Sequence, residues 1–290
     1  MNHPAWKAFI EAAPHNPHLL DFHQFSDLAN RLVSHRPFQV ARYNDGEWVF
    51  MFKTEPYYSR YIARSNYPLA EVEEISKKMM TVIDSRPAYF IGIDSTTLAG
   101  AGSIEPDYEA FQRKISGLNI IYGEIFNAAT VMYGIEALKK PLANRWVLTV
   151  GPDYMKMLKM GEQHISVPLK SCWTAADTIE KQLEEVLTAN LSKQPVVLYS
   201  CSLLAKWLID VFYKKYGDNI TQLDIGSCID PWCGVNSRPW HGALGRYYGL
   251  VLPPMPAERI TTLPASVSTG FPAPSGGYGY GYGYARRRKT

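Results

Sequence analysis

Long apolar runs, a leader peptide and abundant cysteine are all missing from this sequence of 290 residues. No stretch approaches the roughly 20 apolar residues that a transmembrane helix requires, so we expect no membrane span. The opening MNHPAWKAFIEAAPH lacks the basic start and the apolar run of a signal peptide. There are only four cysteines, which suits a protein with reduced thiols. Together these absences predict a cytoplasmic protein.

Signatures of several common metal-binding and nucleotide-binding classes are also missing. Cys228 and Cys233 lie five residues apart, and no second close pair of Cys or His completes a tetrahedral zinc site. No G-x-G-x-x-G follows a strand-like run, and G-x-x-x-x-G-K-[ST] is absent. We therefore expect neither a zinc site nor a dinucleotide-dependent oxidoreductase nor a P-loop NTPase.

Positive charge is concentrated in the C-terminal tail. From Pro256 onward the chain has five basic residues and one acid, which leaves 25 basic and 26 acidic residues before it. That balance does not predict a nucleic-acid-binding face. The tail is rich in Pro, Ser and Gly and ends in GYGYGYGYARRRKT, a low-complexity pattern typical of disorder. We expect one folded domain over 1–255 and a flexible tail over 256–290. A tail that binds glycan, acidic membrane or nucleic acid is the alternative.

Short apolar runs alternate with segments of helical periodicity along the first 255 residues. The runs are rich in β-branched and aromatic residues and predict strands at 38–43, 88–93, 118–123, 145–151, 164–169, 195–200 and 221–226. Helical spacing predicts helices at 25–33, 68–83, 124–139, 174–189 and 202–216. This alternation predicts an α/β fold with a Rossmann-like, mostly parallel sheet flanked by helices.

Polar loops follow four of the predicted strands directly. They are NDGE (44–47), GPD (151–153), SCS (200–202) and GSCID (226–230). In open α/β sheets, ligands bind at the carboxyl ends of the strands. We therefore expect these four loops to lie at one edge of the sheet and to form the functional site.

The NDGE loop places two carboxylates, Asp45 and Glu47, on either side of Gly46. Asn-Asp-Gly is a strong turn signal, so a turn with solvated carboxylates is the simpler interpretation. Carboxylates at i and i+2 also converge on one cation when the residue between them bends freely, as glycine does. Mg²⁺ and Mn²⁺ prefer such oxygen ligands and are often shared with substrate phosphates.

Four motifs, in order along the chain, resemble signature segments of the GT-D-fold glycosyltransferases. RYNDGEW (42–48) looks like the RFGDGE-type signature of that family, and VLTVGPDYMKML (147–158) resembles its middle strand, loop and helix. VVLYSCSLLAKWLIDVF (196–212) is similar to its LGPTAKVLAYDL-type segment. LDIGSCID (223–230) resembles its LDIGHID element. The resemblance spans residues 35–235 and implies a GT-D-like domain.

The resemblance implies a metal-dependent glycosyltransferase that moves a hexosyl or pentosyl group. The donor would be a nucleoside-diphosphate sugar, with a UDP-sugar favoured, and the acceptor a glycan or glycoprotein. Asp45 and Glu47 would hold Mn²⁺ or Mg²⁺ against the diphosphate. The residues implied in substrate and nucleotide binding are Arg42, Asn44, Gly151, Pro152, Asp153, Ser200, Ser202, Lys206 and Asp224.

Simpler roles compete for three of these binding residues. Arg42 suits bidentate recognition of a phosphate, but it can equally point to solvent or pair with Asp45. Asp153 can cap a helix instead of binding at its start. For Lys206, an exposed position on a helix is favoured over phosphate binding.

Sugar transfer with inversion needs a general base near the acceptor hydroxyl, usually a carboxylate or a histidine. Asp230 is the candidate within the matched region, and His241 is the nearest histidine downstream. A turn aspartate and a structural histidine are the competing interpretations. Trp232 and Trp240 suit either a sugar-stacking platform or the core.

The chain departs from the family pattern in four places, and these departures leave two alternatives open. Asn44 replaces a family glycine, the GPTAK glycine turn is not kept, and Ser227-Cys228 replaces the histidine of LDIGHID. The acidic stretch beyond that histidine is replaced by Pro231-Trp232-Cys233-Gly234. A non-catalytic glycan-binding or nucleotide-binding module on the same fold is one alternative. The glycine-containing LDIGSCIDPWCG also resembles the loop of SAM-dependent methyltransferases, although it follows the last predicted strand rather than the first.

Overall fold

The structure, a computed structural model, describes residues 22–43, 47, 50–51, 69–82, 86–93, 117–238 and 240–254. Its centre is one seven-stranded sheet in the order β3-β2-β1-β7-β6-β4-β5. All six neighbouring pairs run parallel. The strands are β1 (Gln39–Tyr43), β2 (Tyr89–Ile93), β3 (Asn119–Tyr122), β4 (Val147–Gly151), β5 (Gln163–Ser166), β6 (Val196–Tyr199) and β7 (Thr221–Asp224).

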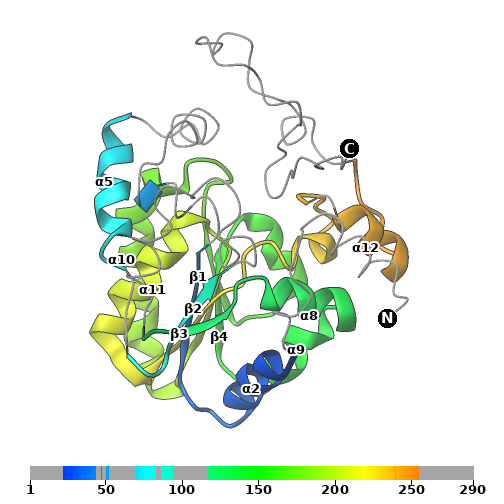
Figure 1. Cartoon of the computed structure of the whole chain (residues 1–290), viewed down its shortest axis with the longest axis horizontal. Helices are drawn as coiled ribbons and strands as arrows, with labels where there is room; N and C mark the ends of the chain where they lie inside the picture. The colour runs from blue at the N-terminus through cyan, green and yellow to red at the C-terminus, as the bar shows by residue number, and fades with distance from the viewer. Residues whose placement is uncertain are drawn as a thin grey trace, which may run out of the picture.

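Helices cover both faces of this sheet, which gives three layers (Figure 1). One face carries α5 (Leu69–Met79), α10 (Ala176–Asn190) and α11 (Leu203–Tyr216); the other carries α2 (Phe22–Val33), α8 (Ile125–Tyr133), α9 (Glu136–Leu142) and α12 (His241–Tyr248). Short 3₁₀ helices complete the description: η3 (Asp153–Leu158), η4 (Cys172–Ala175), η5 (Leu191–Lys193), η6 (Gly217–Asn219) and η7 (Asp230–Cys233).

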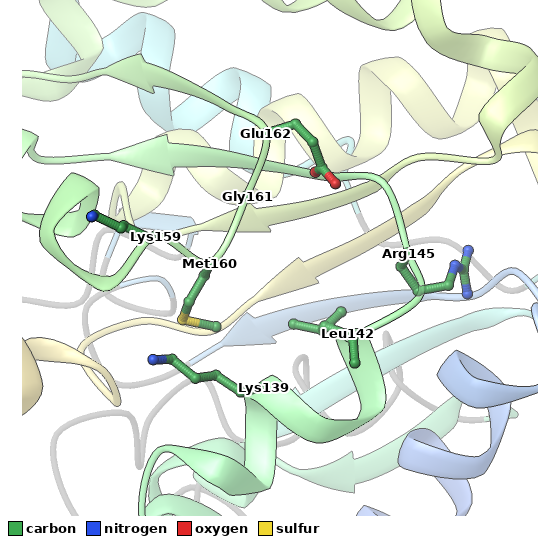
Figure 2. A pocket seen from close by; sticks show the side chains of 8 residues that line it. Lys139, Leu142, Arg145, Lys159, Met160, Gly161 and Glu162 are labelled. Carbon is green, nitrogen blue, oxygen red and sulfur yellow. The ribbon is translucent and has the colours of Figure 1, made fainter.

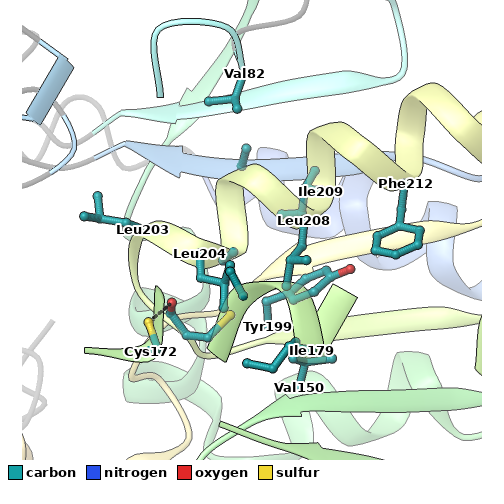
Figure 3. Packing of buried hydrophobic residues seen from close by; sticks show 14 of the residues in the cluster. Val82, Val150, Cys172, Ile179, Tyr199, Leu203, Leu204, Leu208, Ile209 and Phe212 are labelled. Carbon is teal, nitrogen blue, oxygen red and sulfur yellow. Dashed lines mark hydrogen bonds between the residues drawn. The ribbon is translucent and has the colours of Figure 1, made fainter. Parts of the chain in front are cut away.

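The alternation of side chains along each strand builds two separate cores. On β6, Val197 and Tyr199 face the core beneath α5, α10 and α11, whereas Val196 and Leu198 face the core beneath α2, α8 and α9. Figure 3 shows the first of these cores, in which Leu204, Leu208 and Phe212 of α11 lie among the buried residues. All four residues of β6 are buried, as expected for a parallel strand covered on both faces.

The contact between β1 and β7 joins the two halves of the sheet and is unusually short. Only Gln39↔Gln222 and Val40↔Leu223 are paired there, whereas β1 and β2 pair along five residues. A buried polar bridge reinforces this seam. The Gln222 side-chain amide donates to Gln39 Oε1 and to the Ile209 carbonyl, both at 3.0 Å, and the Tyr199 hydroxyl donates to Gln222 Oε1 at 2.8 Å.

The sequence-based prediction of the fold class is confirmed, because all seven predicted strands form one parallel sheet. The single helix predicted at 124–139 is wrong. It is divided into α8 and α9 at Gly134, whose φ of 70° suits glycine and ends the first helix. α12 was not predicted. The structure describes no residue of the predicted 256–290 tail, so the tail and its boundary stay predictions.

None of the helices within the described ranges is both long enough and apolar enough to cross a lipid bilayer. All four cysteines are buried free thiols. Burial raises the pKa of the Cys201 and Cys228 thiols well above the ordinary value, and that of Cys233 to about 12. These thiols are therefore protonated at neutral pH and are poor nucleophiles there.

Gln222→Leu is expected to lower the free energy of unfolding by roughly 2–4 kcal/mol. The leucine leaves Gln39 Oε1 and the Tyr199 hydroxyl buried without this partner, and each such group costs about 1–3 kcal/mol. Urea denaturation measures the change. Gln163→Leu on edge strand β5, where the side chain is exposed, is the matched control and is expected to be near neutral. Equal losses in the two variants would contradict the structural role of the bridge.

Candidate functional site

The site lies at the carboxyl ends of β1 and β7, where the topology of the sheet changes direction. From β1 the chain proceeds outward to β2 and β3, while β7, β6, β4 and β5 extend the sheet on the other side. The helical residues described after β1 include Phe50 and Met51, which pack in the same core as α5, whereas the α-helix after β7 is α12 on the opposite face. Such a switch point is where open α/β sheets bind their ligands. Because the β1–β7 ladder ends at Val40 and Leu223, Arg42 and Asp224 lie beyond the paired part.

On the α11 face, one buried lysine joins two carboxylates. Lys206 Nζ lies 2.7 Å from Glu47 Oε1 and 2.7 Å from Asp224 Oδ2, and it also donates to the Ser202 carbonyl at 3.2 Å. Lys206 is 4% exposed, so this ion pair is shielded from water. Helix α11 begins shortly after β6. Lys206 lies near the start of this helix and is therefore placed over the end of β7, the strand that pairs with β6.

The charge state of Lys206 follows from its two partners. Burial alone would lower the pKa of the ammonium, but Asp224 and Glu47 together raise it above the usual value. Lys206 is therefore charged at neutral pH. Because its folded pKa is raised, its contribution to stability is fully present below about pH 10.4 and is lost as the pH rises through the folded pKa.

On the opposite face, a second buried ion pair reaches across from β1 to α8. Arg42 Nη2 lies 2.6 Å from Glu124 Oε1, and Arg42 Nε donates to the Gly123 carbonyl. Asn127 Nδ2 donates to the other oxygen of Glu124. The Gly226 backbone lies against Arg42 so closely that an added Cβ would stand 1.9 Å from Nη1, and its φ is 54°. This close approach needs glycine at residue 226.

Carboxylates outnumber bases among the buried side chains that the structure describes at this edge. Four carboxylates and two bases are buried there, and these are Glu47, Glu124, Asp224, Asp230, Arg42 and Lys206. The pKa of the Cys228 thiol reflects these neighbours: burial raises it most, Arg42 lowers it, and Asp230, Glu124 and Asp224 raise it further.

These residues fit a divalent cation in donor type. Glu47 and Asp224 direct carboxylate oxygens at one position, which the Lys206 ammonium occupies, and such oxygens are the ligands that Mg²⁺ and Mn²⁺ prefer. No group of three or more potential ligands converges within the part of the chain that the structure describes. Asn44 and Asp45 lie outside the described residues, so the predicted pairing of Asp45 with Glu47 on a metal stays a prediction.

The two predicted bases belong to a separate buried network beside β7. Tyr154 of η3 donates to Asp230 Oδ1 at 3.0 Å, and the Ser237 hydroxyl donates to Asp230 Oδ2. The Ser237 backbone N–H donates to His241 Nδ1 at 3.2 Å, which places the ring proton of neutral His241 on Nε2. Asp230 is 3% exposed and His241 is 1% exposed. A catalytic role for either residue stays a prediction.

The loops after β4 and β6 lie next to each other, because β4 and β6 are paired strands. A Cβ added to Gly151 would stand 3.3 Å from the Ser200 Cβ, so these two predicted residues are neighbours. Pro152 is buried, and Ser202 is exposed at the start of α11 with a φ of 52°. Asp153 is exposed and makes no capping hydrogen bond; its carboxylate instead pairs with Lys156 at 2.6 Å and accepts from Ser166, which lowers its pKa.

Two interpretations of the basic residues are wrong. Lys206 is buried rather than exposed, because Glu47 and Asp224 compensate its charge. Arg42 does not point to solvent, since Glu124 and the Gly123 carbonyl hold it inside. Sequence reasoning missed Glu124, although it follows β3 just as the four polar loops follow their strands. No sequence signal marks Ser237, which lies in an irregular segment.

A basic groove of about 350 Å³ lies away from this site (Figure 2). Lys139, Arg145, Lys159 and Glu162 line it together with apolar residues. It is next to the amino ends of β4 and β5, the edge of the sheet opposite to the candidate site. Arg145 donates to the carbonyls of Leu32 and Gln194 at 2.7 and 2.9 Å, so it ties neighbouring elements together.

Comparison with known proteins gives structural likeness only. No protein-family model matches the sequence, and no curated protein matches it. A new glycosyltransferase (DUF1792) from Streptococcus sanguinis is 13% identical over 72% of this chain and 81% of that chain, with a TM-score of 0.49. A structure described as the highly conserved domain of unknown function 1792, with a distinct glycosyltransferase fold, is 13% identical over 77% and 80%, with a TM-score of 0.49. With TM-scores below 0.5, these likenesses do not decide what this chain does.

Lys206→Met is expected to lower the free energy of unfolding by about 3–5 kcal/mol at pH 7, because it leaves two buried carboxylates without their cation. The stabilisation by Lys206 is lost as the pH rises through its raised folded pKa, so the loss in the variant should shrink at alkaline pH. Urea denaturation at several pH values measures both effects.

The control for this variant is Lys215→Met, which removes an exposed ion pair with Glu184 from the same helix. It should leave the unfolding midpoint almost unchanged. A loss in Lys206→Met that does not depend on pH would contradict the proposed origin of the effect.

Gly226→Ala is expected to destabilise the fold more than Gly234→Ala does. Both residues have positive φ, which costs a non-glycine residue about 1–2 kcal/mol. Only at Gly226 does the new methyl group also collide with Arg42, whereas nothing lies within 4 Å of a Cβ at Gly234. The difference between the two unfolding free energies isolates the collision. Equal values would show that Arg42 moves aside without cost.

Proposed function

We propose that this protein is a metal-dependent glycosyltransferase that uses a nucleoside-diphosphate sugar, with a UDP-sugar favoured. The observation that carries the proposal is the placement of the four motifs that resemble GT-D glycosyltransferases. They are separated by more than 170 residues in the chain, from Arg42 to Asp230. They follow β1, β7, β6 and β4, which are consecutive neighbours in the sheet, and the carboxyl ends of parallel strands share one edge.

Charge at the site supports a metal-bound diphosphate donor. Carboxylates predominate among the buried side chains described at this edge, and they would repel a diphosphate unless a cation intervened. Asp45 and Glu47, with Asp224 beside them, are the residues proposed to hold Mn²⁺ or Mg²⁺. The ion, when bound, would neutralise the charge that develops on the leaving diphosphate. Lys206 holds Glu47 and Asp224 in place for this task.

The loops after β4 and β6 would then hold the nucleotide, and the loop after β7 would face the sugar and the acceptor. Gly151 and Ser200 are adjacent, so the two nucleotide loops form one surface. Tyr154 connects this surface to Asp230 in the loop after β7. The acceptor would be a glycan or a glycoprotein, and Asp230 is the proposed base within reach of that loop.

A second candidate function is a nucleotide-sugar-binding module that does not transfer the sugar. One observation favours it: both oxygens of Asp230 accept hydrogen bonds, from Tyr154 and Ser237, and the Nδ1 of His241 accepts one as well. A base with its acceptor positions engaged removes a proton less readily. Metal-dependent hydrolysis of a UDP-sugar by the protein would contradict this second candidate.

Titration of UDP into the full chain by calorimetry tests the donor site. We expect binding with Mn²⁺ present and at least tenfold weaker binding in EDTA, because the metal links the diphosphate to the carboxylates. Asp45→Asn/Glu47→Gln should lose the metal-dependent part while keeping the shape of both side chains. Binding unchanged in EDTA, or in the double variant, would overturn the metal role of these residues.

Two further measurements complete this test. Asp177→Asn/Glu185→Gln removes two carboxylates from α10 and is the matched control, since both residues are exposed and lie outside the proposed site. It should bind UDP with Mn²⁺ as the unaltered protein does. GDP and TDP extend the titration if UDP does not bind, and failure of all three nucleotides would contradict the nucleotide-sugar donor altogether.

A further inference from the structure

The phosphates of the proposed donor need a basic side chain that faces them. Three basic residues at the carboxyl edge already form ion pairs with carboxylates. Arg42 is held by Glu124, Lys206 by Glu47 and Asp224, and Lys156 by Asp153. Arg42 and Lys206 are also buried, so a ligand reaches neither of them without breaking an ion pair. Arg42 and Lys206 are therefore poorly placed for the phosphate-binding roles predicted for them, and another basic residue is needed to face the phosphates.

Arg238 differs from all three residues in its partner, and from Arg42 and Lys206 in its exposure. Its Nε donates to the Ser227 hydroxyl at 3.0 Å. Within the described ranges it forms no ion pair, and the N–H groups of its two Nη atoms meet no acceptor. Arg238 and Ser227 are both partly exposed, in contrast to the buried Asp224 and Asp230 on the same loop region.

The position of Arg238 is fixed by the site itself. Ser227, which orients its guanidinium, follows Gly226 directly and lies in the loop after β7 at the switch point. Ser237, the residue before Arg238, donates to Asp230. The segment that carries Arg238 therefore has two hydrogen bonds to the region that follows β7. A guanidinium held by its Nε keeps the fork of its Nη atoms for an external anion.

We propose that Arg238, oriented by Ser227, binds the diphosphate of the nucleotide-sugar donor. This inference rests on the proposed function and adds to it the positively charged group that faces the substrate. The planar fork suits two phosphate oxygens at once, which a lysine does not reproduce. Together with the proposed divalent cation, Arg238 would neutralise the charge of the diphosphate.

Calorimetric titration of UDP and of inorganic pyrophosphate, each with excess Mg²⁺, tests the proposal on the full chain. Arg238→Gln should weaken the binding of both ligands roughly 10- to 100-fold, as expected for loss of a charge-assisted contact. Arg238→Lys should recover only part of this loss, because it restores the charge but not the fork. Arg246→Gln, an exposed arginine on α12, is the matched control and should bind both ligands normally.

Substitution of Ser227 provides a second measurement, whose result would differ if Arg238 had only a structural role. Ser227→Ala should weaken UDP binding less than Arg238→Gln, and the double variant should be no weaker than Arg238→Gln alone, since the serine acts through the arginine. Fully additive losses would show that Ser227 acts independently of Arg238 and would overturn its orienting role.

The outcomes separate this inference from the proposed function. UDP binding that is equal in Arg238→Gln and the unaltered chain overturns the role of Arg238 and leaves the donor site standing. Binding of pyrophosphate without UDP, lost in Arg238→Gln, supports Arg238 and contradicts a UDP-sugar as the donor. Binding of neither ligand by the unaltered chain overturns both.

Discussion

The short seam between β1 and β7 is the constraint on which the rest of the structure depends. Two residue pairs and the bridge from Gln222 to Gln39 and Tyr199 hold together the two halves of the sheet. A longer ladder would pair the backbone up to the carboxyl ends of both strands. Because pairing stops at Val40 and Leu223, charged side chains can enter the space between the strand ends.

The charged side chains divide between the two faces of the sheet according to the alternation of the strands. Arg42 lies one residue before Tyr43 and therefore points to the α8 face, where Glu124 meets it. Asp224 lies one residue after Leu223 and points to the α11 face, where Lys206 meets it. Each buried base is thus compensated by a helix that covers its own face.

This arrangement explains why the buried bases are poor candidates for direct substrate binding. Moving Lys206 toward a phosphate would leave Glu47 and Asp224 uncompensated in a dry environment, and the same holds for Arg42 and Glu124. Such residues position the loops around them. A basic residue at the rim, such as Arg238, can exchange water for a phosphate without that penalty.

The sequence by itself determined the seven strands, the parallel sheet and the edge at which the polar loops gather. These follow from local periodicity and from the rule that parallel strands present their carboxyl ends together. The tertiary structure alone decided which charges pair. Glu124 lies 82 residues from Arg42, and the lysine of α11 meets Glu47 across the sheet edge, contacts that no local pattern encodes. The tertiary structure also decided which charged side chains are buried. In the sequence, Lys206 resembles any exposed helical lysine, and only the structure places its two carboxylate partners around it.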